Sequence, residues 1–163
     1  MKSVIIVGSS RKKGNTTKIV EAIEKQYNAE VINLSDYEFS YYDYESNNKN
    51  DDFFGLIKGI IEKYDTLVFA TPVYWYTMSG IMKVFFDRFS DLLRIEKETG
   101  RKLRGKNMAV LSNSHDSEND EAFYLPFVKS ADYLGMNYLG YVHYNADKEE
   151  ETSIKQINFL QKR

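Results

Sequence analysis

The segment from Gly8 to Thr17 combines residue types that can bind a phosphate, and it directly follows an apolar run. If a helix begins near its end, free backbone N–H groups and the positive end of the helix dipole favour an anion there. The hydroxyls of Ser9, Thr16 and Thr17 can donate hydrogen bonds to it. Arg11 can add a charge-assisted hydrogen bond. The residue types therefore predict a phosphate-binding segment between a strand and a helix.

Two common phosphate motifs are absent from this segment. Five residues separate Gly8 from Gly14, and Asn15-Thr16 stands where a Walker A loop has Lys followed by Ser or Thr. The Gly-x-Gly-x-x-Gly pattern of dinucleotide-binding domains is also missing, so ATP hydrolysis and Rossmann-type NAD binding lose support. An alternative interpretation is an ordinary strand–helix turn in which Asn15 or Thr16 caps the helix.

A second segment, from Thr71 to Gly80, combines a proline with three consecutive aromatic residues. Tyr74, Trp75 and Tyr76 offer ring faces and polar tips to a flat ligand, and Pro72 is expected to fix the turn. In open α/β sheets, ligands bind at the carboxyl ends of the strands, where this segment and the phosphate segment should meet. The alternative is that the aromatic residues pack on the sheet edge or form a dimer interface.

Five short apolar runs, rich in β-branched residues, predict buried strands at 4–7, 31–34, 66–70, 108–111 and 138–142. Segments with helical spacing separate or follow these runs. Their apolar faces are Ile19, Val20, Ile23 and Tyr27; Phe54, Ile57, Ile60 and Ile61; Met82, Phe85, Phe86, Phe89 and Leu93; Phe123, Phe127, Ala131 and Leu134; and Ile154, Ile157 and Leu160. Pro126 leaves the start of the fourth helix open. The alternation predicts an α/β fold with a doubly wound parallel sheet.

Composition limits the possible functions. The 163 residues fit a single domain, 1–163, and 22 Lys and Arg against 24 Asp and Glu give a formal net charge of -2. This charge predicts neither nucleic acid nor an anionic membrane as a partner. Without cysteine, the chain has no thiol nucleophile and no thiolate-held metal site, so redox chemistry would need a bound cofactor. The apolar runs are too short to cross a bilayer, and we expect a cytoplasmic protein.

Two further features have a structural and a functional interpretation. The segment from Tyr37 to Asp52 is rich in Tyr, Asn and Asp, which is typical of a solvated loop but also allows a lid over a ligand. Lys83 and Asp87 lie four positions apart on an expected helix, and with Arg88 they are interpreted as a structural ion-pair set rather than as catalytic groups.

Together, these segments resemble the NADPH-dependent FMN reductase family. The matching residues are Gly8-Ser9-Ser10-Arg11, Gly14-Asn15-Thr16, Thr71-Pro72-Val73-Tyr74-Trp75, Ser79-Gly80, Lys83, Phe86-Asp87-Arg88 and Leu134-Gly135-Met136. The resemblance implies a flavodoxin-like, three-layer α/β fold with a five-stranded parallel sheet in the order 2-1-3-4-5. The iron–sulfur branch of the family carries its cysteines between the second strand and second helix, where this chain has none.

The resemblance also assigns three groups of FMN-binding residues. Ser9, Arg11, Asn15, Thr16 and Thr17 would surround the phosphate; Pro72, Val73, Tyr74 and Trp75 would border the isoalloxazine ring; and Ser112, Asn113 and His115 would belong to a third contact loop. This third loop departs from the family pattern, which often has glycines there. Tyr76 stands where a small residue is often found, so access to one flavin face would be narrower.

The activity implied is transfer of electrons from NAD(P)H through FMN to a small acceptor, such as a flavin or a quinone, in a homodimer. The flavin would perform the chemistry, so no catalytic side chain and no metal is expected. His115 is interpreted as an ordinary polar residue or as a group that steers a ligand, and His143 as structural. Two alternatives stay open: a flavodoxin-type electron carrier, and a non-catalytic module with or without FMN.

Overall fold

A computed structural model describes residues 1–148 and 157–160 of the chain. Its central sheet is parallel, with the strand order β2-β1-β3-β5-β6. The strands are β1 (Ser3–Val7), β2 (Glu30–Asn33), β3 (Thr66–Tyr74), β5 (Asn107–Ser114) and β6 (Asn137–Asn145). A short strand, β4 (Thr77–Met78), pairs antiparallel with the end of β3. When the five parallel strands alone are numbered in chain order, leaving out β4, their order in the sheet is 2-1-3-4-5. This order confirms the flavodoxin-like prediction.

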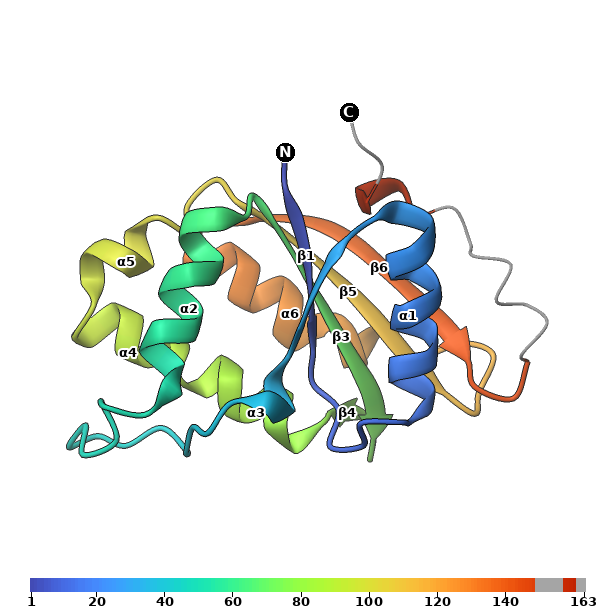
Figure 1. The fold of residues 1–163 in the computed structure, drawn as a ribbon, viewed down its shortest axis with the longest axis horizontal. Coiled ribbons are helices and arrows are strands. Elements are labelled where there is room, and N and C mark those ends of the chain that lie inside the picture. The colour runs from blue at the N-terminus through green and yellow to red at the C-terminus, as the bar shows by residue number, and fades with distance from the viewer. Residues whose placement is uncertain (149–156, 161–163) are drawn as a thin grey trace.

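Helices cover both faces of this sheet (Figure 1). They are α1 (Asn15–Tyr27), α2 (Asp52–Lys63), α3 (Gly80–Asp87), α4 (Phe89–Arg94), α5 (Lys97–Arg101) and α6 (Glu121–Leu134), with 3-10 turns η1 (Leu34–Asp36) and η3 (Asn158–Leu160). One hydrophobic core joins the sheet to α2, α3, α4 and α6. A second core joins its other face to α1 and η3. Alternate residues of β1 enter different cores, because successive side chains of a strand point to opposite faces.

Three expected helices differ in detail. The third breaks at Arg88 into α3 and α4, and Leu93 faces outward. The fourth, α6, begins at Glu121 and continues through Pro126, with the Asp120 carboxylate capping it through the amide of Ala122. Of the expected last helix, Ile154 lies outside the described residues. Ile157 and Leu160 are buried, as predicted, on the α1 side of the sheet.

Two central strands continue beyond their apolar runs. Residues 71–74 extend β3 and the polar residues 112–114 extend β5, and Thr71 pairs in register with Ser112. In Figure 1 the carboxyl ends of the strands point to the lower edge of the molecule, where β4 and the start of α3 lie. The extensions therefore place the second and third predicted segments at one edge of the sheet. Among the residues that the structure describes, no helix has the length and apolarity needed to cross a membrane.

Candidate functional site

The phosphate segment connects β1 to α1 and presents its backbone donors unpaired. Gly14 is the N-cap of α1 and makes no side-chain capping bond, so neither Asn15 nor Thr16 caps this helix. Within the described part of the chain, no hydrogen bond is formed by the amide N–H groups of residues 12–17. Such a run of donors at the positive end of a helix has the groups that can hold an anion.

Hydroxyl groups hold this segment in shape. Ser9 is buried, and its Oγ accepts from the amide of Arg11 and donates to the Arg11 carbonyl, both at 3.3 Å. Thr17 Oγ1 donates to the same carbonyl at 3.3 Å. Thr16 Oγ1 donates to Asn113 Oδ1 at 2.7 Å, so its hydroxyl is occupied and its amide is the donor left for a ligand.

These residues fit a phosphate monoester. The Arg11 side chain is exposed beside the unpaired amides and forms no ion pair with another described residue. Asn15, at the first position of α1, is exposed as well. An anion at this position would gain the amide hydrogen bonds, the helix dipole and a guanidinium without displacing a protein contact.

Close packing joins the phosphate segment to the start of α3. Ser79, the N-cap of α3, donates from Oγ to the Gly8 carbonyl at 2.6 Å, and its amide donates to Thr71 Oγ1 at 3.0 Å. A Cβ atom on Gly8 would lie 2.7 Å from both Cβ and Cε of Met82. Gly8 is therefore required for this close approach. Sequence reasoning did not single out Ser79 as a linking residue, although a Ser before an apolar helix is a typical N-cap signal.

The aromatic segment forms a β-hairpin. Trp75 and Tyr76 make its two-residue turn between β3 and β4, with φ of 49° and 63°. The prediction that Pro72 fixes the turn is wrong, since Pro72 lies within β3, opposite Asn113 of β5. Positive φ at both turn positions is the type I′ geometry, in which Asn and Gly are preferred. Two aromatic residues in left-handed backbone therefore store strain at the tip of the hairpin.

The side chains of this hairpin lie open to solvent. Trp75 is 92% exposed and Tyr76 is 82% exposed; Tyr74 is exposed to a lesser degree, and Val73 is half-buried. Within this chain, the tip therefore does not pack on the sheet edge. The exposed rings are available to a ligand or to a second protein molecule.

The third segment is a strand end rather than a loop. Ser112 and Asn113 belong to β5 and are buried. Ser112 Oγ forms hydrogen bonds with Tyr124 OH at 2.7 Å and with His143 Nδ1 at 2.8 Å. This network ties β5 to α6 and β6. In this structure the Ser112 hydroxyl is therefore occupied by contacts within the protein.

The two histidines have different surroundings. His143 Nε2 lies 3.2 Å from both Ser114 Oγ and the Asp116 carbonyl, so the ring holds the chain that leaves β5, as the structural interpretation predicts. His115 lies on the surface, with its Nδ1 2.8 Å from the Asp147 carboxylate. Of the third-segment residues, His115 is thus the one whose side chain is exposed.

Arg88 has different partners from those expected. Lys83 pairs with Asp87, as the spacing predicts. The guanidinium of Arg88 instead lies between the carboxylates of Asp51 and Asp91, 2.5 Å and 2.6 Å away. Asp51 is 37 positions distant in the sequence, and no local pattern indicated this pair.

Comparison with known proteins identifies the family. The family model described as NADPH-dependent FMN reductase matches residues 1–151. The chain belongs to the NADPH-dependent FMN reductase family. It is an oxidoreductase of this FMN-binding, flavodoxin-like family, which confirms the resemblance found in the sequence motifs.

Relatives of this FMN reductase family member carry related names. YwqN of Bacillus subtilis (strain 168), provisionally described as an NAD(P)H-dependent FMN-containing oxidoreductase, is 30% identical over 154 residues, which cover 87% of this chain and 83% of YwqN. An NADPH azoreductase from Bacillus sp. (strain OY1-2) is 31% identical over 97 residues, 60% of this chain and 54% of that protein.

Solved structures show the same fold. The Trp repressor binding protein from Bacillus subtilis aligns with a TM-score of 0.69 and 28% identity, over 87% of this chain and 83% of its own. General stress protein 14 from Treponema denticola, solved in complex with FMN, aligns with a TM-score of 0.69 and 18% identity over 98% of both chains. Across the residues described here, no group of three or more His, Cys, Asp or Glu could hold a metal ion.

Proposed function

We propose that this chain binds FMN non-covalently and passes electrons from NAD(P)H to a small acceptor. The observation that carries the proposal is the run of unpaired amides at 12–17, which ends in a helix N-terminus without a side-chain cap. Arg11 adds a positive charge beside it. A phosphate monoester such as that of FMN matches this set of donors.

The remaining residues would position the flavin ring. The strands β3 and β5 pair in parallel up to Pro72 and Asn113. The hairpin of β3 and β4 extends beyond this pair. Val73, Tyr74 and Trp75 would border the ring. Bound FMN supplies hydride acceptance from a nicotinamide and electron donation to a second molecule. The protein's contribution is therefore binding, orientation and backbone donors, and no side-chain acid or base is assigned.

The acceptor in this proposal is a flat, electron-poor small molecule. Relatives bear the names NADPH azoreductase and NADPH-quinone reductase, and these names favour acceptors of the azo or quinone type. The exposed rings of Trp75 and Tyr76 fit such molecules because they can stack on them. We also propose that the protein forms a homodimer, since the same exposed tip can be covered by a second copy; sedimentation equilibrium tests this.

The test of the proposal is the visible spectrum after FMN reconstitution and desalting, followed by anaerobic addition of NADH or NADPH. Retained flavin that bleaches on addition of a nicotinamide supports the reductase. Retained flavin that ignores both nucleotides but accepts single electrons from dithionite supports an electron carrier. A protein that does not retain FMN overturns the assignment of the site.

Comparison of FMN with riboflavin isolates the phosphate segment. Arg11→Ala should weaken FMN binding by about tenfold, because one charge-assisted hydrogen bond is lost, and should leave riboflavin binding nearly unchanged. Lys25→Ala, in the last turn of α1, is the matched control because it removes a cation from the opposite end of the same helix. Equal losses for both flavins in Arg11→Ala would contradict a phosphate contact.

A further inference from the structure

The segment between β2 and α2, residues 37–51, lies at the same edge of the sheet as the proposed flavin site. It runs along the lower edge of the molecule in Figure 1, and its entrance is tied to the phosphate segment by the ion pair of Lys12 with Asp36 at 2.7 Å. Phe39 packs on Phe53 and on Phe85 of α3, with ring centroids 6.4 Å and 6.0 Å apart. The segment is therefore attached to two elements of the site.

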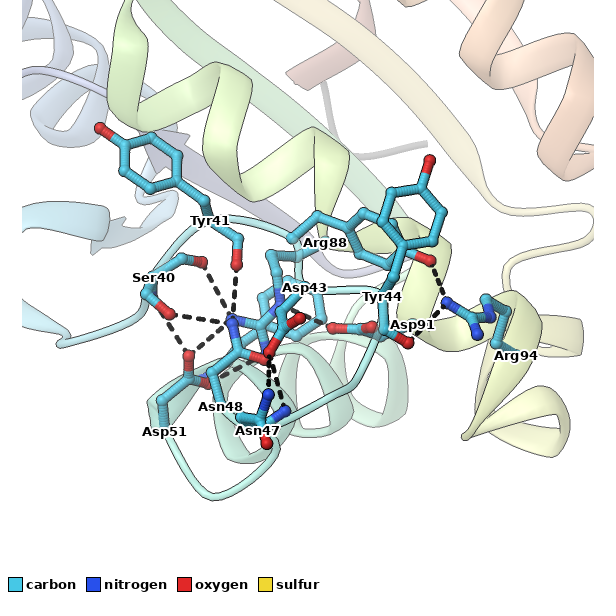
Figure 2. A network of polar contacts seen from close by, with 12 residues as sticks. Ser40, Tyr41, Asp43, Tyr44, Asn47, Asn48, Asp51, Arg88, Asp91 and Arg94 are labelled. Atoms are coloured by element: carbon cyan, nitrogen blue, oxygen red, sulfur yellow. Dashed lines mark hydrogen bonds and ion pairs between the residues drawn. The ribbon is translucent and has the colours of Figure 1, made fainter.

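A buried arginine holds this segment from inside (Figure 2). The Arg88 side chain is 0% exposed, and it donates to the Ser40 carbonyl at 3.0 Å and to both carboxylate oxygens of Asp51. Its Nε donates to Asp91, and the guanidinium lies 4.7 Å from the centre of the Phe53 ring. Burial of a charged group is costly unless it is fully paired. A merely solvated connection needs no such anchor.

The tip of the segment is also fixed by specific contacts. The Asp43 carboxylate accepts from the amides of Glu45 and Asn47 and from the Asn47 side chain. Arg94 donates to Tyr42 OH and to the Tyr44 carbonyl, and its guanidinium lies over both tyrosine rings. These contacts restrict the conformations open to the loop, which lowers the entropy cost of binding a ligand there.

Tyr41 is presented differently from its neighbours. Its ring points away from the polar network in Figure 2 and is 78% exposed. Its carbonyl accepts from Asn48 Nδ2 at 2.7 Å, which fixes the backbone below the ring. Among the described residues, no ring contact or side-chain hydrogen bond involves the Tyr41 ring. Tyr44 is exposed to a similar degree, 75%, but its ring contacts Tyr42 and Arg94, so Tyr41 differs from it in having no such contact.

We infer that residues 39–51 form a preformed wall of the acceptor site, in which Arg88 is a positioning residue and Tyr41 contacts flat acceptors with more than one ring. This inference rests on the proposed function, because it concerns the selectivity of the same site. A rigid aromatic group contributes contact area with little loss of conformational entropy on binding. On this inference an acceptor with two rings gains a contact with Tyr41 that a single-ring acceptor lacks, so the site should select acceptors by size.

The test compares 2-methyl-1,4-naphthoquinone, which has two rings, with 1,4-benzoquinone. In FMN-loaded protein, Tyr41→Ala should raise the Kd and KM for the naphthoquinone about three- to tenfold, the effect of one lost aromatic contact. It should leave kcat, the benzoquinone KM and the rate of flavin bleaching by NAD(P)H unchanged. Tyr41→Phe should restore wild-type values. Tyr133→Ala is the matched control, since Tyr133 is 77% exposed at the end of α6.

Arg88→Met should produce the same change in KM together with faster hydrogen exchange at the amides of Ser40 and Asn47. If this variant fails to fold, Arg94→Met serves instead, because Arg94 holds the tip from the exposed side. Unchanged naphthoquinone binding in Tyr41→Ala, or equal changes for both quinones, would overturn the inference that Tyr41 contacts the acceptor.

The two proposals fail separately. If the protein does not retain FMN, the proposed function is lost, and equilibrium dialysis of the naphthoquinone against the apo chain decides on the wall alone. Tighter binding by wild type than by Tyr41→Ala supports it, and equal binding overturns it. If FMN is retained but no nicotinamide bleaches it, the same dialysis is performed on the FMN-loaded protein with the same two outcomes.

Discussion

Thr16 and Asn113 are 97 positions apart in the chain, and a 2.7 Å hydrogen bond joins their side chains in a buried position. Thr16 lies in the first turn of α1, and Asn113 lies near the end of β5. The bond therefore fixes the phosphate segment relative to the strand end behind the proposed flavin ring. This pair therefore holds two parts of the proposed ligand site at a set spacing.

Removal of this bond should cost both stability and cofactor affinity. Thr16→Val keeps the shape of the side chain but leaves Asn113 Oδ1 buried without its partner, so the free energy of unfolding should fall by about 1–3 kcal/mol. FMN binding should weaken as well, because the amides at the start of α1 are less well placed. Urea denaturation and flavin titration measure the two effects.

Thr17→Val is the matched control for this prediction. Its hydroxyl makes a longer bond, 3.3 Å to the Arg11 carbonyl, in a less buried position, and its loss should cost under about 1 kcal/mol. A double-mutant cycle with Asn113→Leu should give a coupling energy of about 1 kcal/mol or more. A coupling near zero would show that the bond contributes nothing to the native state.

A side chain larger than hydrogen at Gly8 should not fit between the end of β1 and α3. In Gly8→Ala the new methyl group would lie 2.7 Å from two atoms of Met82, one of them the Cβ, which cannot rotate away. Overpacking of this kind should destabilise the protein by about 1–3 kcal/mol. Gly59→Ala serves as the control, since Gly59 is exposed within α2 with nothing near its Cβ position, and it should stabilise by up to about 1 kcal/mol. Thermal unfolding of both variants provides the measurement.

Apolar patterning predicted the cores of all five parallel strands, whereas their order in the sheet was predicted from the resemblance to the family. It underestimated β3 and β5, because Pro72 and Ser112 look like loop residues and gain strand structure only by pairing in register with neighbouring strands. The same limit applies to the hairpin tip, where Trp75 and Tyr76 occupy positions that normally signal a turn through Asn and Gly. The residue types in these short segments do not indicate the strand pairing that the neighbouring strands impose on them.

Site features could likewise be predicted where their residues are close in sequence, and not where they come together only in the fold. The phosphate segment was recognisable because its donors, cation and helix start are consecutive in the sequence. The anchor of residues 37–51 was not, since Arg88 meets Asp51 only after α2 and α3 have packed together. The four-residue spacing within one helix identified the exposed ion pair of Lys83 and Asp87. It gave no indication of the buried ion pair of Arg88 and Asp51.

Asp51 should make the stability of the protein depend on acid pH. Burial by itself raises the pKa of the Asp51 carboxyl, but hydrogen bonds from Arg88 and from the amides of Ser40 and Phe53 outweigh it and hold the pKa below its ordinary value of 3.8. A depressed pKa in the folded state contributes stability above the unfolded pKa, and this contribution is lost as the pH falls through the folded value.

Asp51→Asn should therefore lower the free energy of unfolding by about 2 kcal/mol at pH 7, because the buried cation loses a paired charge. The difference from wild type should shrink below about pH 4, where wild type loses the same charge by protonation. Urea midpoints between pH 7 and pH 3 measure it. Asp87→Asn, which removes a carboxylate from an exposed ion pair, should change stability by less than about 1 kcal/mol. A difference that grows with acid would contradict the predicted sign.

The strained hairpin tip predicts opposite effects on stability and binding. Replacement of Trp75-Tyr76 by Asn-Gly supplies the residues that a type I′ turn prefers, and relief of two left-handed aromatic residues should stabilise the apo protein by about 1–3 kcal/mol. The same change removes two exposed rings from the edge of the proposed flavin site. FMN affinity should then fall by about tenfold, consistent with strain that is retained because the rings contact a ligand. Thermal unfolding without FMN and flavin titration separate the two effects, and a variant that gains stability while binding FMN as wild type does would show that the tip serves another purpose.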